Sequence, residues 1–289
     1  MFLYRGNIML MVVTYVALIG LCAGSFINAL VWRIHEQAAE QGKKKPSRER
    51  LAKLSISKGR SICPHCHHEL VAKDLVPLFS WLSLRGQCRY CHKPIAIQYP
   101  LVEAATALLF VASYAWWPRD LHGLEIAVFV LWLVVLTGLM ALLVYDLRWY
   151  LLPNRIVYPL TVIAGLLALL EIVHATHPLT AIFNTVLAVT IGGGLFYVLF
   201  QLSKGKWIGG GDVKLGWLLG LVAGTPGKAF LFIFLAAAIG SFISIPLLAS
   251  NKLKRNSTIP FGPLLIIGGI ITVLFGSDIL QWYRDTLIL

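Results

Sequence analysis

Long apolar runs dominate this sequence and limit what it can fold into. One run covers residues 8–32, and further runs follow at about 101–117, 124–145, 156–173, 180–202, 213–224, 229–249 and 259–276. A transmembrane helix needs about 20 mostly apolar residues. Hydrophobic residues make up 58% of the chain and charged residues 13%, whereas soluble domains have about 45–50% and about 25%. We therefore expect an all-α polytopic membrane protein with about eight transmembrane helices, and we exclude a soluble enzyme.

One hydrophilic segment, residues 33–100, interrupts the apolar runs. It contains two Cys-x-x-Cys pairs, Cys63/Cys66 and Cys88/Cys91. Four cysteines in this arrangement are typical of a tetrahedral zinc site, and a disulfide framework or a thioredoxin-type redox pair fits the pattern less well. The segment is too short for a sizeable core, so we expect zinc to fold it. The sequence thus predicts three parts: a first transmembrane helix (1–32), a zinc-binding module (33–100) and a larger membrane domain (101–289).

The distribution of basic residues predicts the orientation of the chain. Lys and Arg number 25, Asp and Glu 13, and the formal net charge is +12. All but four of the basic residues fall in segments on the same side of the membrane as the cysteine module; the four exceptions are Arg5, Arg119, Lys228 and Arg284. The positive-inside rule places that side in the cytoplasm. Topology and anionic lipid head groups account for the excess charge, so nucleic acid is not an expected partner.

Two aspartates occur where apolar runs meet the cytoplasmic side. Asp146 follows the run 124–145, and Asp212 precedes the run 213–224. Two carboxylates at one depth share a proton, so that one activates water while the other protonates a leaving group. Two structural roles stay open as alternatives to catalysis. Asp212 could be a helix N-cap, and Asp146 could be an interfacial residue paired with Arg148. An ion-coupled secondary transporter is another use of the same pair.

Small and polar residues also line one face of the first apolar run. Gly24 and Asn28 recur at helical spacing ahead of Arg33. Such a face usually indicates close helix packing. Glu103, near the start of the second run, is a further candidate for a buried carboxylate, or it compensates the dipole at a helix N-terminus.

Taken in order, these motifs resemble the bacterial prepilin leader peptidase/N-methyltransferases, which are GxGD-type membrane aspartic peptidases of type IV pilus and type II secretion systems. The matching segments are GSFIN (24–28) with Arg33, the paired cysteines with LRGQ (84–87), YPLVE (99–103), DLRWYLLPN (146–154), GGGDVK (209–214) and PFGP (260–263). A Gly-x-Gly-Asp motif alone fits many glycine-rich loops. The complete ordered set is specific to this family.

The resemblance implies that Asp146 and Asp212 are catalytic, and that residues 101–289 form the aspartic peptidase domain. It implies cleavage of the basic leader peptide of a type IV prepilin or a type II secretion pseudopilin, at the cytoplasmic face of the bacterial inner membrane. The apolar helix of the substrate stays in the lipid bilayer. Residues expected around the substrate are Gly209, Gly211, Lys214, Pro153 and Asn154.

The resemblance also implies that the new N-terminal residue is methylated with S-adenosylmethionine. The residues associated with this second activity are Gly86, Gly24, Asn28, Arg33 and Glu103. No Gly-x-Gly-x-x-Gly nucleotide fingerprint accompanies them, so methyl transfer rests on the resemblance alone. The family tends to have Arg before the Tyr-Pro pair, where this chain has Gln98. That departure bears on methylation more than on proteolysis.

Overall fold

A computed structural model describes residues 2–56, 59–250 and 260–287, and over these residues the regular elements are helices, accompanied by two isolated β-bridges and by turns and loops. Six described helices are long and apolar enough to cross a membrane: Met9–Gln41, Leu124–Trp149, Asn154–His174, Pro178–Ser203, Pro226–Ala249 and Gly262–Thr286. The all-helical membrane fold is therefore confirmed. Four basic residues used to orient the chain, Lys58, Lys252, Lys254 and Arg255, lie outside the described residues.

The expected count of eight spans is not confirmed. The two remaining apolar runs form α4 (Gln98–Ala115) and α9 (Gly210–Ala223), which are not among the six candidate spans. Helix α9 has 14 residues, and at 1.5 Å per residue it reaches about 21 Å, less than the roughly 30 Å hydrocarbon core. It packs against α6, α7, α11 and the π-helical turn η2 (Thr190–Gly194). Helices therefore surround α9 on several sides, and its apolar residues contact protein.

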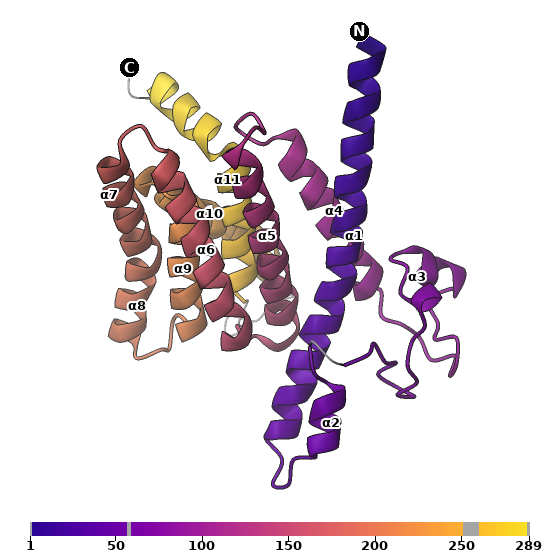
Figure 1. The fold of residues 1–289 in the computed structure, drawn as a ribbon. Coiled ribbons are helices and arrows are strands. Elements are labelled where there is room, and N and C mark those ends of the chain that lie inside the picture. Colours follow the sequence, from indigo (N-terminus) through magenta and orange to yellow (C-terminus); the bar gives the residue numbers. More distant parts are fainter. Residues whose placement is uncertain (1, 57–58, 251–259, 288–289) are drawn as a thin grey trace. The chain divides into compact units, whose positions relative to one another are not determined.

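The chain divides into two compact units, residues 1–115 (unit 1) and residues 116–289 (unit 2), both visible in Figure 1. Unit 1 contains α1 (Phe2–Gln41), α2 (Arg48–Lys53), the 3₁₀ turn η1 (Ala72–Asp74), α3 (Phe79–Ser83) and α4. Helix α1 continues past residue 32, because the following residues are mostly Glu, Gln and Ala, which favour helix. Whether boundaries at 32 and 100 delimit functional domains stays a prediction.

Helices α1 and α4 approach each other at glycines. A Cβ on Gly20 would lie 2.6 Å from the Cα of Ala107, and a Cβ on Gly24 would lie 2.5 Å from the Cα of Glu103. One turn further, the Asn28 side-chain amide donates a hydrogen bond to the carbonyl of Tyr99 at 3.0 Å. The small face of the first apolar run is thus a helix-packing face, as the sequence predicts.

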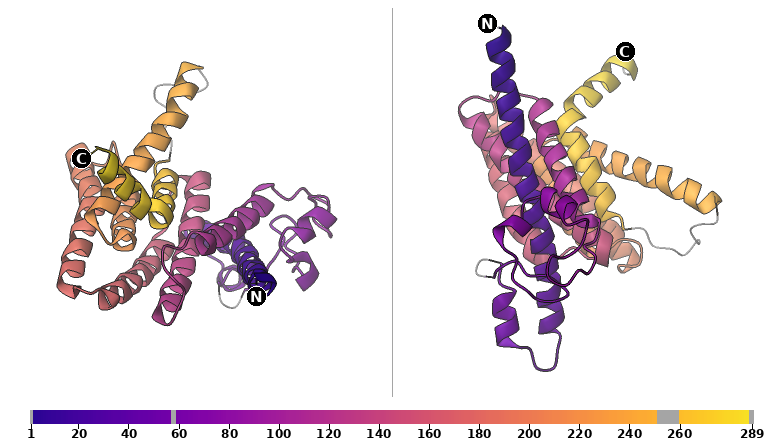
Figure 2. Two further views of the ribbon diagram at one scale, coloured as in Figure 1. Left: turned by 90° about the horizontal axis from the view of Figure 1, so that it is seen from above. Right: turned by 90° about the vertical axis from the view of Figure 1, so that its right-hand side faces the viewer.

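Unit 2 is a helical bundle. Its helices are α5 (Leu124–Trp149), α6 (Asn154–His174), α7 (Pro178–Val189), α8 (Leu195–Ser203), α9, α10 (Pro226–Ala249) and α11 (Gly262–Leu287), with η2 joining α7 to α8. Its core includes the fully buried Trp132, Leu139, Leu215 and Leu265. The second half of α10 extends away from the bundle (Figure 2), and Phe242 there is 80% exposed. An apolar side chain so exposed is compatible with contact with lipid.

Candidate active site

Asp146 lies in the last turn of α5 and its side chain is 5% exposed. Tyr150 ends the helix in the left-handed conformation (φ 56°), and its backbone N–H donates a hydrogen bond to the carbonyl of Asp146 at 2.8 Å. This left-handed cap turns the chain away from the helix directly after the aspartate. Burial at a helix C-terminus disfavours a carboxylate, so Asp146 lowers the stability of the fold. A destabilising residue at such a position indicates a functional role.

Asp212 lies in the first turn of α9, after the N-cap residue Gly209. One carboxylate oxygen, Oδ2, accepts a hydrogen bond from the N–H of Gly209 at 3.3 Å. Asp212 is therefore not the N-cap residue itself, but from position N3 its carboxylate accepts a hydrogen bond from the N-cap residue. Asp212 is also close enough to Asp146 for the two carboxylates to repel each other. This hydrogen bond fixes Oδ2 of Asp212 and leaves Oδ1 without a hydrogen bond to the described residues, so capping and pairing with Asp146 are compatible.

Two glycines allow other segments to approach the aspartates. A Cβ on Gly262, the first residue of α11, would overlap Oδ2 of Asp146. A Cβ on Gly211 would lie 3.1 Å from both Cβ and Cδ1 of Leu152. Leu152 Cδ1 would also lie 3.6 Å from a Cβ on Gly262. The connection between α5 and α6 thus lies next to Gly211 of α9 and Gly262 of α11, beside the two aspartates.

Lys214 and Asn154, both expected near the substrate, are in direct contact. The Lys214 ammonium donates a hydrogen bond to Oδ1 of Asn154 at 2.8 Å. It also lies 5.2 Å from the centre of the Tyr158 ring, a cation–π distance. Pro153 is the N-cap residue of α6, directly before Asn154. These contacts hold the Lys214 ammonium of α9 against the first turn of α6.

Sequence reasoning missed three residues of this site: Gly262, Leu152 and Tyr158. Gly262 and Leu152 lie inside segments noted above, PFGP (260–263) and DLRWYLLPN (146–154), but no role was assigned to them. Their contacts arise from tertiary packing between segments more than 50 residues apart in the sequence. Tyr158 lies one turn after Asn154 on α6, so helical spacing from Asn154 was the available signal.

The four cysteines form a second cluster, in unit 1. The Sγ atoms of Cys63, Cys66, Cys88 and Cys91 all lie within 4.8 Å of one another, and Cys63 and Cys91 are separated by 3.9 Å. Tetrahedral thiolate sites with metal–sulfur bonds of about 2.3 Å have sulfur atoms about 3.8 Å apart. The cluster therefore fits one tetrahedral metal ion.

The two cysteine pairs have the same backbone hydrogen bonds. The N–H of Cys63 donates to the carbonyl of His68 at 3.0 Å, and the N–H of Cys88 donates to that of Lys93 at 2.9 Å. In each turn a histidine, His67 or His92, adopts positive φ. Burial raises the pKa of the Cys88 thiol, but backbone N–H groups of Cys91 and Tyr90 outweigh this and lower it to about 7. A thiol so tuned is readily available as a thiolate ligand.

The residues associated with methyl transfer all join parts of unit 1. Gly86 (φ 71°) packs against Trp81, whose Cζ2 would lie 2.9 Å from a Cβ. Glu103 Oε2 accepts a hydrogen bond from the N–H of Leu78 at 2.8 Å. The Arg33 guanidinium donates to three carbonyls, those of Ser55, Ile56 and Gly59. Gly24 and Asn28 lie where α1 and α4 approach each other. Among the described residues, Asn28 Oδ1 is buried with no hydrogen-bond partner.

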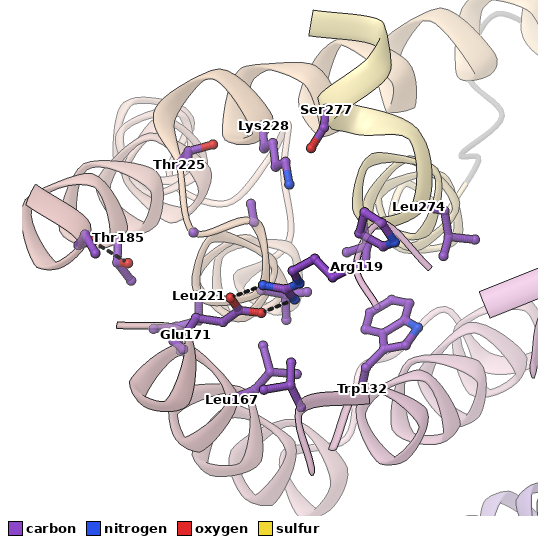
Figure 3. A pocket seen from close by; sticks show the side chains of 18 of the residues that line it. Arg119, Trp132, Leu167, Glu171, Thr185, Leu221, Thr225, Lys228, Leu274 and Ser277 are labelled. Atoms are coloured by element: carbon purple, nitrogen blue, oxygen red, sulfur yellow. Dashed lines mark hydrogen bonds and ion pairs between the residues drawn. The ribbon is translucent and has the colours of Figure 1, made fainter. Parts of the chain in front are cut away.

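A cavity of about 660 Å³ lies at the opposite end of unit 2, between the start of α5 and the ends of α6 and α9. Arg119 is hydrogen-bonded through two nitrogens to Glu171, and its Nε lies 2.9 Å from Glu125. Figure 3 shows this ion pair crossing the cavity, with Lys228 on another side of it. None of the residues predicted for the site lines this cavity, so it is distinct from the aspartate pair.

Comparison with known proteins identifies the family of this chain. Residues 18–117 match the bacterial peptidase A24 N-terminal domain, and residues 132–245 match the type IV leader peptidase family. The prepilin leader peptidase/N-methyltransferase of Aeromonas hydrophila is 32% identical over 283 residues, covering 93% of this chain and 92% of that protein. The chain belongs to the prepilin leader peptidase/N-methyltransferase family. This membership supports an enzyme with peptidase and methyltransferase activity.

Other relatives agree with this family assignment. The Pseudomonas aeruginosa protein of the same name is 33% identical, with 92% of this chain and 91% of that protein covered. The Bacillus subtilis protein is 30% identical, with 80% and 87% covered. No solved structure matches the chain. The type IV leader peptidase match spans Asp146 and Asp212, and the A24 N-terminal match spans all four cysteines.

Proposed function

We propose that this protein cleaves the leader peptide of type IV prepilins or type II secretion pseudopilins, with Asp146 and Asp212 as the catalytic pair. The observation that carries the proposal is the packing at one end of unit 2, where Leu152 lies against Gly211, next to Asp212, and near Gly262, which meets Asp146. Repulsion between the two carboxylates favours one shared proton, which is the state an aspartic peptidase needs. The relatives' names supply the substrate class.

Cleavage then follows the chemistry of a carboxylate pair. The ionised aspartate takes a proton from water, and the water oxygen forms a bond to the carbon of the scissile peptide. The protonated aspartate hydrogen-bonds the carbonyl oxygen and stabilises its developing charge. The C–N bond breaks, the amine leaves with a proton from the pair, and the leader keeps the new carboxylate. Gly211 and Gly262 carry no side chain, which lets Leu152 pack against Gly211 and lets the Asp146 carboxylate lie directly against Gly262.

We infer from the relatives' names that the new N-terminus is methylated, and that S-adenosylmethionine supplies the methyl group. The five associated residues form helix and loop contacts, and a donor set for a nucleoside is not assembled among them. We therefore derive no methylation step through them. Among these five residues, Asn28 Oδ1 is the one buried acceptor that has no hydrogen-bond partner in the described part of the chain.

We propose that the metal held by the four cysteines is zinc. Soft thiolates in tetrahedral array favour this ion, and four ligands close the coordination shell, which indicates a structural role. The experiment is elemental analysis of purified protein, with Cys88→Ser as the comparison. One zinc per chain in the native protein and a loss in the variant support the assignment.

The proposed location is the inner membrane of a bacterium, with the cysteine module on the cytoplasmic side and the lipid bilayer as a constant partner. The uneven distribution of Lys and Arg supports this orientation. The proposal includes no nucleic-acid partner. A secondary transporter receives no support from the relatives.

The decisive experiment is mass spectrometry of a prepilin incubated with the purified protein in lipid and S-adenosylmethionine. The native protein is expected to remove the leader and add one methyl group. Asp146→Asn and Asp212→Asn are each expected to leave the leader intact, while methylating a substrate that was cleaved beforehand. Full cleavage by both variants would refute the catalytic assignment.

A further inference from the structure

The cysteine module exposes large apolar side chains next to α4. Phe79 and Leu82, three residues apart on α3, are 69% and 64% exposed. Ile97 and Leu101, in one helical turn at the start of α4, are each 59% exposed. We call these four residues the α3–α4 patch. Side chains of this size are rarely clustered in water without a partner.

Two hydrogen bonds hold α3 and its neighbouring turn against α4. The N–H of Leu78, which precedes α3, donates to Oε2 of Glu103 at 2.8 Å. The indole N–H of Trp81 on α3 donates to the carbonyl of Ile95, just before α4, at 3.2 Å. Helix α3 accordingly lies beside the lower part of α4 in Figure 1. The α3–α4 patch is therefore fixed relative to the helix, and is not carried on a loose loop.

The packing of α4 on α1 shows how deep this region lies. Glu103 lies against Gly24, and Gly24 belongs to the candidate span Met9–Gln41. The apolar run of α1 continues for eight more residues to Trp32, which is about 12 Å along a helix. The start of α3 is thus level with a residue well inside an apolar span. Side chains at that depth face lipid unless protein covers them.

The charges around α3 suit a lipid surface. Lys73 and Arg85, on either side of α3 in the sequence, are exposed. Asp74 is the only acidic residue between positions 71 and 97, and it pairs with Arg89 at 2.7 Å. Basic residues beside exposed aromatic and aliphatic side chains are typical of segments that lie in the membrane interface, where anionic head groups attract them.

We infer that the α3–α4 patch inserts into the membrane interface, so that the cysteine module lies on the bilayer surface. The partner of the α3–α4 patch is therefore the lipid leaflet around the start of α4. Only the assignment of this leaflet to the cytoplasmic side rests on the proposed topology. The surface holds the module at the level of the membrane interface, where a membrane-anchored substrate also lies. A module tethered only by a linker would spend much of its time away from that level.

Site-specific photo-crosslinking tests this inference on the full chain. A benzophenone amino acid replaces Phe79 or, separately, Leu82, and the protein is placed in nanodiscs of equal parts phosphatidylglycerol and phosphatidylcholine. Val162 on α6, 65% exposed within the candidate span Asn154–His174, is the lipid-facing reference, and Glu69, exposed in the cysteine module, is the aqueous reference. Mass spectrometry after illumination identifies what each position has reacted with. Metal content checks that every variant is folded.

We expect lipid adducts at positions 79 and 82 at a yield close to that at 162 and several-fold above that at 69. Crosslinks from 79 and 82 to peptides of residues 116–289 would show that unit 2 covers the α3–α4 patch, and would overturn the inference. Lipid yields at 79 and 82 as low as at 69 would overturn it as well. The test uses no substrate, so its outcome is independent of the peptidase and methyltransferase activities.

Discussion

Replacing Gly262 by alanine tests the arrangement around Asp146 most directly. The added Cβ would overlap Oδ2 of Asp146, so either the carboxylate or the start of α11 must move. Overpacking a buried site of this kind costs about 1–3 kcal/mol of folding free energy. Displacing a catalytic group by about 1 Å costs about 100-fold in rate. The expected loss of leader cleavage is therefore much larger than the loss of stability.

The assay compares initial rates of leader cleavage for native protein and Gly262→Ala in the same lipid, with thermal unfolding measured in parallel. Gly165→Ala is the matched control, because a Cβ at Gly165 meets no atom within 4 Å, and alanine favours helix. Gly165→Ala should keep its cleavage rate, and its unfolding temperature should stay the same or rise. If Gly262→Ala cleaves within twofold of the native rate while folded, the geometry argued here for Asp146 is wrong.

Three further outcomes follow from contacts described above. Lys214→Met removes the hydrogen bond to Asn154 and the contact with Tyr158. This variant should cleave about 10-fold more slowly or worse, since hydrogen bonds to charged groups contribute about 1.5–3 kcal/mol. Lys214→Arg should recover part of the lost cleavage rate in the same assay. Chelation of the metal should make residues 60–97 sensitive to limited proteolysis and leave cleavage unchanged, because the aspartate pair lies in the other unit; a parallel loss of cleavage would contradict this. Glu171→Gln removes an ion pair worth about 1 kcal/mol at a partly exposed site, so it should lower the unfolding temperature by a few degrees. The cleavage rate should not change. Slower cleavage would show that the distant cavity affects the active site.

Much of the site could be predicted because its residues are rare in their surroundings. A carboxylate at the end of an apolar run is costly, which singles out Asp146, and four cysteines in one hydrophilic segment indicate a common ligand. These signals are local and depend little on how the helices pack. The role of Gly24 and Asn28 in packing α1 on α4 was likewise readable from helical spacing.

The number of spans and the role of Gly262 could not be predicted in this way. Apolar composition does not distinguish a helix surrounded by lipid from one surrounded by protein, which is why α9 was counted as a span. Gly262 meets Asp146 across more than 100 residues of sequence, and only the tertiary arrangement of α5 and α11 creates that contact. A position that must be glycine because another segment packs against it has no periodic pattern in the sequence that would reveal it.

The cysteine cluster has a consequence for the unfolded chain as well. Cys66 and Cys88 come from separate turns, so one metal ion ties together positions 22 residues apart and closes the segment between them into a loop. By polymer arguments, closing a loop of this length costs the chain roughly 3 kcal/mol of conformational entropy, which simultaneous binding of both pairs to a metal ion would offset. Neither pair of cysteines closes that loop alone. We therefore expect metal binding and folding of residues 63–91 to be a single all-or-none event. A variant that lacks either pair of cysteines should neither bind the metal nor fold this segment.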